Sequence, residues 1–267
     1  MDIIGLRCHI KKADSKAKNQ KSKVKKMQLH VCKTYDELSE HLADWMVEYV
    51  SKVLSTKERF SVALTGGNTP KKLYEILASD AYKNKIDWSR ANIFIGDERF
   101  VPFDDERSNA KMIRETLLDH VAVDEAHVHF MQTENMSAET SANAYEEVLQ
   151  HYFNKNETST FDLVLLGLGD NVHTLSLFPN ETEVIFEKTK WCTFFWLQEQ
   201  NMYRITLTAP IVNAAKEIAF LINGKAKAQA LKEVLHGENN PEKFPAQIIK
   251  PTNGELHFFV DEAAMNG

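Results

Sequence analysis

A histidine and two polar neighbours follow a strongly apolar segment in the second half of the chain. Leu163–Leu166 has no polar alternation, which favours a strand buried on both faces of a parallel sheet. The glycine-rich turn 167–169 leads directly to Asp170, Asn171 and His173. Ligands bind beyond the carboxyl ends of such strands, and a neutral imidazole there can act as a general base or acid. A surface turn with a solvated histidine would show the same pattern. The other loops are needed to distinguish this interpretation from a ligand-binding site.

Two more buried strands are predicted to end in loops of chemical interest. Phe60–Leu64 leads into the loop 65–70 (TGGNTP) and a helix over 71–78, where backbone N–H groups and the helix dipole can hold an anion. Ala91–Ile95 leads into the charged segment 97–99 (DER), and Asn109 is placed to cap the next helix, expected over 110–118, or to contact a ligand. A helix-capping turn and a solvated loop are the plainer interpretations. In a parallel sheet, however, the carboxyl ends share one edge, so the loops can converge.

The remaining elements alternate between strand and helix. Thr34 and Glu37 form a capping box that opens a helix through about Val53. Another helix is expected over 137–153. Further strands are expected at 27–32, 188–197, 203–208, 217–223 and 255–260, with a helix over 225–235 and a short one at 261–264. This order predicts an α/β fold: one doubly wound domain with a mostly parallel, Rossmann-like sheet and helices on both faces.

Charge is distributed unevenly along the chain. Residues 1–26 hold nine lysines or arginines and two aspartates, whereas the whole chain has a formal net charge of −6. The segment 11–26 lacks apolar periodicity, so residues 1–26 are predicted to be a disordered basic extension of a folded domain 27–267. A nucleic-acid or targeting arm is the alternative, but arginine-rich and aromatic character is missing. The acidic remainder argues against general nucleic-acid binding.

The apolar segments and the cysteines indicate which cellular compartment the protein suits. No apolar run approaches the roughly 20 residues that a membrane helix needs. Cys8, Cys32 and Cys192 are few and scattered, and they lack the paired spacing of a zinc site. They are interpreted as reduced thiols of a cytoplasmic protein without a metal or cofactor.

Taken together, the loop residues form an ordered set of motifs that resembles the 6-phosphogluconolactonase family, which is related to the glucosamine-6-phosphate deaminases. The set spans most of residues 30–264. Its members are Thr65–Pro70, Asp97-Glu98-Arg99 with Val101-Pro102 and Ser108-Asn109, His173-Thr174 with Ser176–Pro179, Arg204–Thr208, Gly224 with Lys227-Ala228, and Pro245-Ala246.

The resemblance implies hydrolysis of 6-phospho-D-glucono-1,5-lactone to 6-phospho-D-gluconate in the oxidative branch of the pentose phosphate pathway. It implies that His173 activates water and that a guanidinium and an ammonium group hold the phosphate. The expected partner is the small lactone, acted on by a monomer or small homo-oligomer. The catalytic candidates are His173, Asn171, Asp97 and Arg99, and the substrate-binding candidates are Thr65, Gly66, Gly67, Asn68, Asn109, Arg204 and Lys227.

The chain departs from the family beside its histidine. Asn171 and Val172 stand where the family usually has Asp and Gly. The amide oxygen of Asn171 can still accept an imidazole N–H, or Asp170 can compensate from one position earlier. Two other functions therefore stay open. A deaminase usually carries a different run with an acidic residue after its histidine, whereas 174–179 (TLSLFP) fits the lactonase. A non-catalytic sugar-phosphate sensor is the other alternative.

Overall fold

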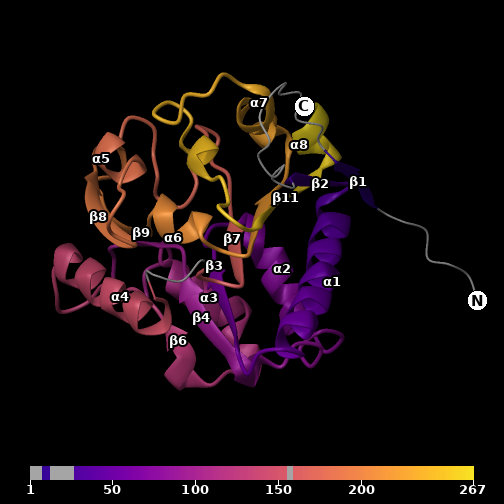
Figure 1. The fold of residues 1–267 in the computed structure, drawn as a ribbon, viewed down its shortest axis with the longest axis horizontal. Helices are drawn as coiled ribbons and strands as arrows, with labels where there is room; N and C mark the ends of the chain where they lie inside the picture. The colour runs from indigo at the N-terminus through magenta and orange to yellow at the C-terminus, as the bar shows by residue number, and fades with distance from the viewer. Residues whose placement is uncertain (1–7, 13–26, 155–158) are drawn as a thin grey trace, which may run out of the picture.

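The computed structural model describes residues 8–12, 27–154 and 159–267 (Figure 1). Its main element is an eight-stranded sheet with the order β1-β2-β11-β10-β7-β3-β4-β6. Every neighbouring pair is parallel except β1 and β2. The bounds are β1 Cys8–Lys12, β2 Met27–Cys32, β3 Phe60–Leu64, β4 Ala91–Ile95, β6 Val128–His129, β7 Leu163–Leu166, β10 Glu217–Ile222 and β11 Glu255–Asp261. The predicted mostly parallel α/β fold is confirmed.

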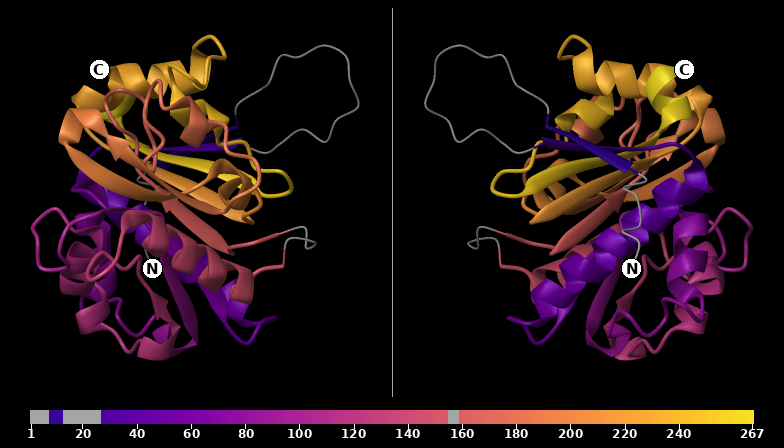
Figure 2. Two further views of the ribbon diagram at one scale, coloured as in Figure 1. Left: turned by 90° about the vertical axis from the view of Figure 1, so that its left-hand side faces the viewer. Right: turned by 90° about the vertical axis from the view of Figure 1, so that its right-hand side faces the viewer.

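Helices cover both faces of this sheet. Figure 2 shows α1 on one face of the strands near the C-terminus, with α7 and α8 on the other. The helices are α1 Tyr35–Leu54, α2 Thr69–Ala78, α3 Asn109–Thr116, α4 Ala138–Tyr152, α5 Thr182–Ile185, α6 Ala209–Asn213, α7 Ala228–His236 and α8 Glu262–Asn266. Within the described ranges, no helix combines the length and the apolar character needed to cross a membrane.

Helix α1 illustrates how local signals and burial agree. The Thr34 hydroxyl accepts a hydrogen bond from the Glu37 backbone N–H at 3.2 Å, and the Glu37 carboxylate accepts one from the Lys33 N–H at 3.2 Å. These two bonds satisfy amide groups that a helix start leaves open. One stripe of the helix is buried against the sheet, formed by Leu38, Leu42, Met46 and Val50.

A second sheet was not anticipated from the sequence. It has three antiparallel strands in the order β5-β9-β8, namely β5 Asp97–Arg99, β9 Met202–Leu207 and β8 Cys192–Leu197. The residues 97–99 were interpreted as a loop because three polar positions carry no strand pattern. They form a strand because they pair with β9. The paired residues of β9 lie about a hundred positions later in the chain.

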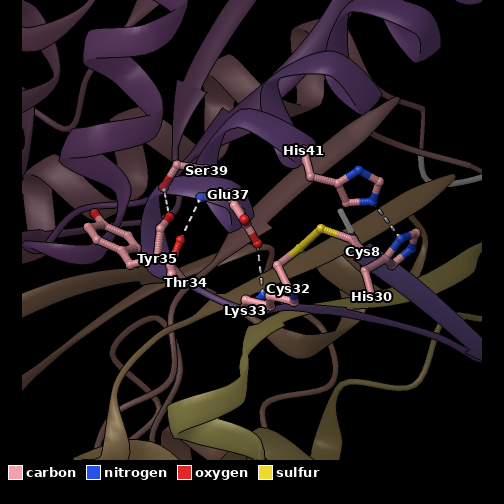
Figure 3. Close-up of a disulfide and its surroundings, with 9 residues drawn as sticks. All are labelled: Cys8, His30, Cys32, Lys33, Thr34, Tyr35, Glu37, Ser39 and His41. Carbon is pink, nitrogen blue, oxygen red and sulfur yellow. Dashed lines mark hydrogen bonds between the residues drawn. A yellow bond between two sulfur atoms is a disulfide. The ribbon is translucent and has the colours of Figure 1, made fainter. Parts of the chain in front are cut away.

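The N-terminal region corrects two predictions. Residues Cys8–Lys12 form β1, which pairs with β2, so the prediction of a disordered extension is wrong for these five residues. The rest of that extension, 1–7 and 13–26, lies outside the described residues. Cys8 and Cys32 face each other across the two strands and form a disulfide (Figure 3). The prediction of reduced thiols is therefore wrong for this pair, whereas Cys192 is free and buried.

We expect the Cys8→Ser variant to be less stable than the wild type under oxidising conditions. Cross-linking residues 24 positions apart restricts the unfolded chain, which is worth about 3 kcal/mol. Thermal unfolding of both proteins, measured with and without dithiothreitol, checks this. The difference should vanish when reductant is present; a difference that persists in reductant would mean that the serine perturbs packing rather than the cross-link.

Candidate active site

Four neighbouring strands, β10, β7, β3 and β4, end at one edge of the main sheet, and the loops that follow them surround a cavity of about 170 Å³. Ten of the eleven predicted site residues line it: Thr65, Gly66, Gly67, Asn68, Asp97, Arg99, Asn109, His173, Arg204 and Lys227. The eleventh, Asn171, does not line the cavity but bonds to His173. The structure thus brings together the loops that the parallel-sheet prediction expected to converge.

The imidazole of His173 is oriented by its neighbour two positions earlier. Nδ1 of His173 lies 2.5 Å from Oδ1 of Asn171, and the same oxygen accepts the His173 backbone N–H at 3.3 Å. An oxygen can only accept here, so Nδ1 carries the hydrogen and Nε2 keeps its lone pair. The ring also stacks on Phe178, with centroids 4.2 Å apart. Asn171 therefore fixes the tautomer that a general base requires.

The charge state of His173 follows from its surroundings. Burial lowers its pKa to about 4, and the positive charges of Arg204 and Lys227 act in the same direction. The Asp97 carboxylate opposes them by favouring the imidazolium form. His173 is consequently neutral at physiological pH.

The turn that carries this histidine is tightly constrained. A Cβ atom at Gly169 would lie 2.0 Å from Nδ1 of His173, so only glycine allows the ring to fold back over the turn. Val172 has a φ of 65°, in the left-handed region that a β-branched side chain rarely adopts. Its side chain is buried, and its backbone carbonyl accepts the Ala246 N–H at 2.9 Å. These contacts hold Val172 in a conformation that glycine adopts without strain.

A buried ion pair forms one wall of the cavity. Nη2 of Arg204 lies 2.7 Å from Oδ2 of Asp97, and both side chains are almost fully buried. Ser176 bridges them, since its hydroxyl donates to Asp97 at 2.6 Å and accepts from Nε of Arg204 at 2.9 Å. Burial alone would raise the pKa of Asp97, but Arg204, Arg99 and the Ser176 hydrogen bond hold it below its usual value. Asp97 is therefore a carboxylate.

The ion pair with Asp97 limits how many N–H groups of Arg204 can bind a phosphate. Nε and Nη2 of Arg204 bind Ser176 and Asp97, and Nη1 donates to Oε1 of Gln200 at 3.1 Å. Each nitrogen of the guanidinium thus already has a protein acceptor. Two of the five N–H groups that an arginine carries remain for a ligand.

Lys227 and Arg99 also contribute positive charge to the cavity, and they are less fully bonded to protein acceptors than Arg204 is. Nζ of Lys227 lies 2.5 Å from Oδ1 of the exposed Asp170, an ion pair at the mouth of the cavity. Asp170 is thus paired with the lysine, and Asn171 is the residue that bonds His173. Arg99 donates from Nη1 to the Arg107 carbonyl at 2.7 Å, whereas its buried Nε has no acceptor among the described residues.

The loop between β3 and α2 forms another wall. Gly67 has a φ of 93°, which favours glycine, and a Cβ atom at Gly66 would lie 1.9 Å from Oδ1 of Asn109. The amide of Asn109 is itself held by donating to the Asp97 carbonyl at 2.8 Å. The loop and the start of α3 can therefore touch only because position 66 has no side chain. Backbone N–H groups at the start of α2 complete this wall as a place for an anion.

Two polar residues that support the cavity were not singled out as site residues from the sequence. Glu98 is buried and accepts the backbone N–H groups of Arg99, Asn109 and Ala110 at 2.7–2.8 Å, which anchors the start of α3. Burial raises the pKa of Glu98 to about 7, against these hydrogen bonds. Ser176 is the second. Both lie inside motifs that the sequence shows, but their burial depends on the second sheet.

Comparison with known proteins agrees with this geometry. Residues 33–258 match the family model described as glucosamine-6-phosphate isomerases/6-phosphogluconolactonase. A 6-phosphogluconolactonase of Synechocystis is 38% identical over 80% of this chain and 87% of its own length. One of Nostoc is 36% identical over 83% of this chain and 90% of its own length.

Solved structures give the same result. The 6-phosphogluconolactonase of Thermotoga maritima superposes with a TM-score of 0.76 and 28% identity, covering 88% of this chain and 100% of that one. The enzyme of Trypanosoma brucei gives 0.77 and 26%, covering 88% and 96%. A monomeric glucosamine-6-phosphate deaminase, at 21% identity and a TM-score of 0.75, shares the fold.

Proposed function

The chain belongs to the family of glucosamine-6-phosphate isomerases and 6-phosphogluconolactonases, and we propose that it is a 6-phosphogluconolactonase. The reaction is hydrolysis of 6-phospho-D-glucono-1,5-lactone to 6-phospho-D-gluconate, in the oxidative branch of the pentose phosphate pathway. One observation carries the proposal: His173 lines the cavity with Nδ1 bound to Asn171, so that Nε2 is available as a base.

The chemistry needs few groups, because a lactone is an ester already activated by its ring. Nε2 of His173 removes a proton from water, and the water oxygen bonds to the lactone carbonyl carbon. The oxyanion that forms is stabilised by hydrogen-bond donors such as the guanidinium of Arg99, which lines the cavity. The bond between this carbon and the ring oxygen then breaks. The imidazolium returns its proton to the departing oxygen, which leaves a carboxylic acid and a hydroxyl group, and the acid then loses its own proton to the solvent.

Asp97 supplies the negative charge that residue 171 lacks. Asn171 can orient His173 but cannot stabilise an imidazolium by charge, whereas the Asp97 carboxylate raises the pKa of the ring against the effect of burial. Arg204 and Ser176 keep this carboxylate ionised and in place. In our proposal, Asp97 therefore assists when His173 becomes protonated, and Asn171 fixes the ring.

The phosphate group binds beside Lys227 and the glycine loop after β3. Lys227 provides a point charge there, and the N–H groups of Gly66, Gly67 and Asn68 provide hydrogen bonds. A phosphate dianion competes with Asp170 for the lysine. Arg204 adds its two remaining N–H groups, and Thr65 and Asn109 border the sugar. The proposal needs no cofactor, and it places the reaction in the cytoplasm, carried out by a monomer or small homo-oligomer.

The direct test is a coupled assay with freshly generated 6-phosphogluconolactone, from which spontaneous hydrolysis is subtracted. We expect the wild-type chain to accelerate hydrolysis. His173→Gln should lower kcat by about 10²–10⁴-fold, the usual contribution of a positioned base, with little change in affinity for 6-phosphogluconate. Binding of 6-phosphogluconate without acceleration would indicate a sensor, and turnover of glucosamine 6-phosphate would indicate a deaminase. Full activity of the glutamine variant would remove His173 from the mechanism.

The pH profile tests the role of Asn171. Activity requires neutral His173, so kcat/KM should fall as the pH drops through the pKa of this ring, about 4 in the wild type. A carboxylate in Asn171→Asp favours the imidazolium and should move this acidic limb upward by about 1–3 pH units. Turnover at pH 7 should rise or stay the same. An unmoved limb would show that another group sets it.

Lys227→Ala tests the phosphate site. Loss of its charged hydrogen bond should weaken binding by roughly 1.5–3 kcal/mol, which appears mainly as an increase in KM. Arg204→Ala is less informative, because it also leaves the buried Asp97 charge unpaired. The matched control is Lys225→Ala, which removes a lysine two positions away that does not line the cavity. Equal affinity of wild type and Lys227→Ala for 6-phosphogluconate would place the phosphate elsewhere.

A further inference from the structure

Two tyrosine hydroxyls hold the ends of the glycine loop after β3, residues 65–69. The hydroxyl of Tyr74 in α2 accepts the Thr65 backbone N–H at 3.0 Å and donates to the carbonyl of the same residue at 2.8 Å. The hydroxyl of Tyr35, which Figure 3 labels at the start of α1, donates to the Thr69 carbonyl at 2.6 Å. The loop is therefore attached to α2 through its first residue and to α1 through its last.

The contact between Tyr74 and Thr65 also fixes the direction of the next N–H group. The carbonyl of Thr65 and the N–H of Gly66 belong to one planar peptide unit, in which they point in opposite directions. While Tyr74 holds the carbonyl, the Gly66 N–H points away from the buried ring of Tyr74. Gly66 lines the cavity. A reversal of this peptide unit would put a carbonyl oxygen, which repels an anion, in the place of a hydrogen-bond donor.

The glycine loop keeps its own donors for a ligand. In the part of the chain that the structure describes, the N–H groups of Gly66, Gly67 and Asn68 have no protein acceptor. All three residues line the cavity. Glycines allow more backbone conformations than other residues, so ordering this loop around a phosphate costs conformational entropy. Attaching Thr65 and Thr69 before a ligand binds removes part of that cost.

A third tyrosine makes the same contact without serving a ligand. At the end of β4, the hydroxyl of Tyr145 accepts the Ile95 N–H at 2.9 Å and donates to the Ile95 carbonyl at 3.2 Å. The N–H that follows, that of Gly96, donates to the Leu64 carbonyl at 2.9 Å and is not available to a ligand. Tyr145 thus joins elements of the core, whereas the N–H that Tyr74 orients is free to bind an anion.

We propose that Tyr35 and Tyr74 are positioning residues for the phosphate group of the substrate. They hold the glycine loop in the arrangement that presents its N–H groups, and so favour a phosphorylated lactone over an unphosphorylated one. The inference rests on the proposed function and adds two residues that do not line the cavity themselves. Burial raises the pKa of both tyrosines, so their hydroxyls stay protonated at physiological pH and remain donors to the two carbonyls.

Calorimetric titration of the full-length protein with 6-phosphogluconate, and separately with inorganic phosphate, tests the proposal. Tyr74→Phe removes only the hydroxyl, and we expect it to weaken the binding of both ligands about 3–10-fold, the net value of about one hydrogen bond. Tyr35→Phe should weaken both about 2–5-fold, and it keeps the proposal testable if Tyr74→Phe does not fold. In the lactonase assay the loss should appear as a higher KM with kcat nearly unchanged.

Two matched controls lose a tyrosine hydroxyl elsewhere. Tyr145→Phe removes the equivalent contact at the end of β4, and Tyr49→Phe removes a bond of 2.9 Å to the Asp162 carbonyl. Each should lower the melting temperature but bind both ligands as the wild type does. The proposal is overturned if folded Tyr35→Phe and Tyr74→Phe bind either ligand like the wild type, or if the controls lose as much affinity. A wild-type chain that binds 6-phosphogluconate without hydrolysing the lactone would refute the lactonase proposal alone.

Discussion

The buried ion pair between Asp97 and Arg204 connects the parts of the molecule that form the cavity. Each residue belongs to the small antiparallel sheet, while Ser176 joins the pair from the segment after β7, and Asn109 joins it from α3. Two charges removed from water are stable only if their remaining hydrogen bonds are satisfied. Because the partners come from distant segments, satisfying the pair also fixes the walls of the cavity relative to one another.

The same pair reconciles an acidic chain with an anionic ligand. The protein has a net charge of −6, yet Arg99, Arg204 and Lys227 all line one cavity. Asp97 neutralises part of this charge by pairing with Arg204, whereas Lys227 pairs with Asp170, which is exposed. The cavity thus offers positive charge to a phosphate, and the Asp97 carboxylate favours the imidazolium form of His173.

Some of this arrangement could be predicted from the sequence, because it depends on local patterns. The uninterrupted apolar segment Leu163–Leu166 and the capping box at Thr34 predict a buried strand and a helix, and both are present. Parallel strands must end at a common edge, which brings the predicted loops together. These steps need no knowledge of which distant residues meet.

The remainder depends on pairings that local patterns do not contain. The three residues of β5 form a strand only because β9 lies beside them, and Arg204 reaches Asp97 across 107 positions. The sequence alone predicts that Glu98 lies in a solvated turn, because it does not reveal the second sheet. In the structure Glu98 is buried. Likewise, Cys8 and Cys32 lie in unremarkable contexts, and only the antiparallel register of β1 and β2 places them opposite each other.

The bond between Cys8 and Cys32 turns the backbone between them into a closed ring. Eight lysines lie within that ring, between positions 11 and 26. A protease that cleaves after any of them opens the ring without separating the products, because the fragment that begins at Met1 stays covalently attached to β2. The cut chain therefore migrates as one species in denaturing electrophoresis without reductant and as two with it. Proteolytic processing of this region would be invisible until the thiols are restored.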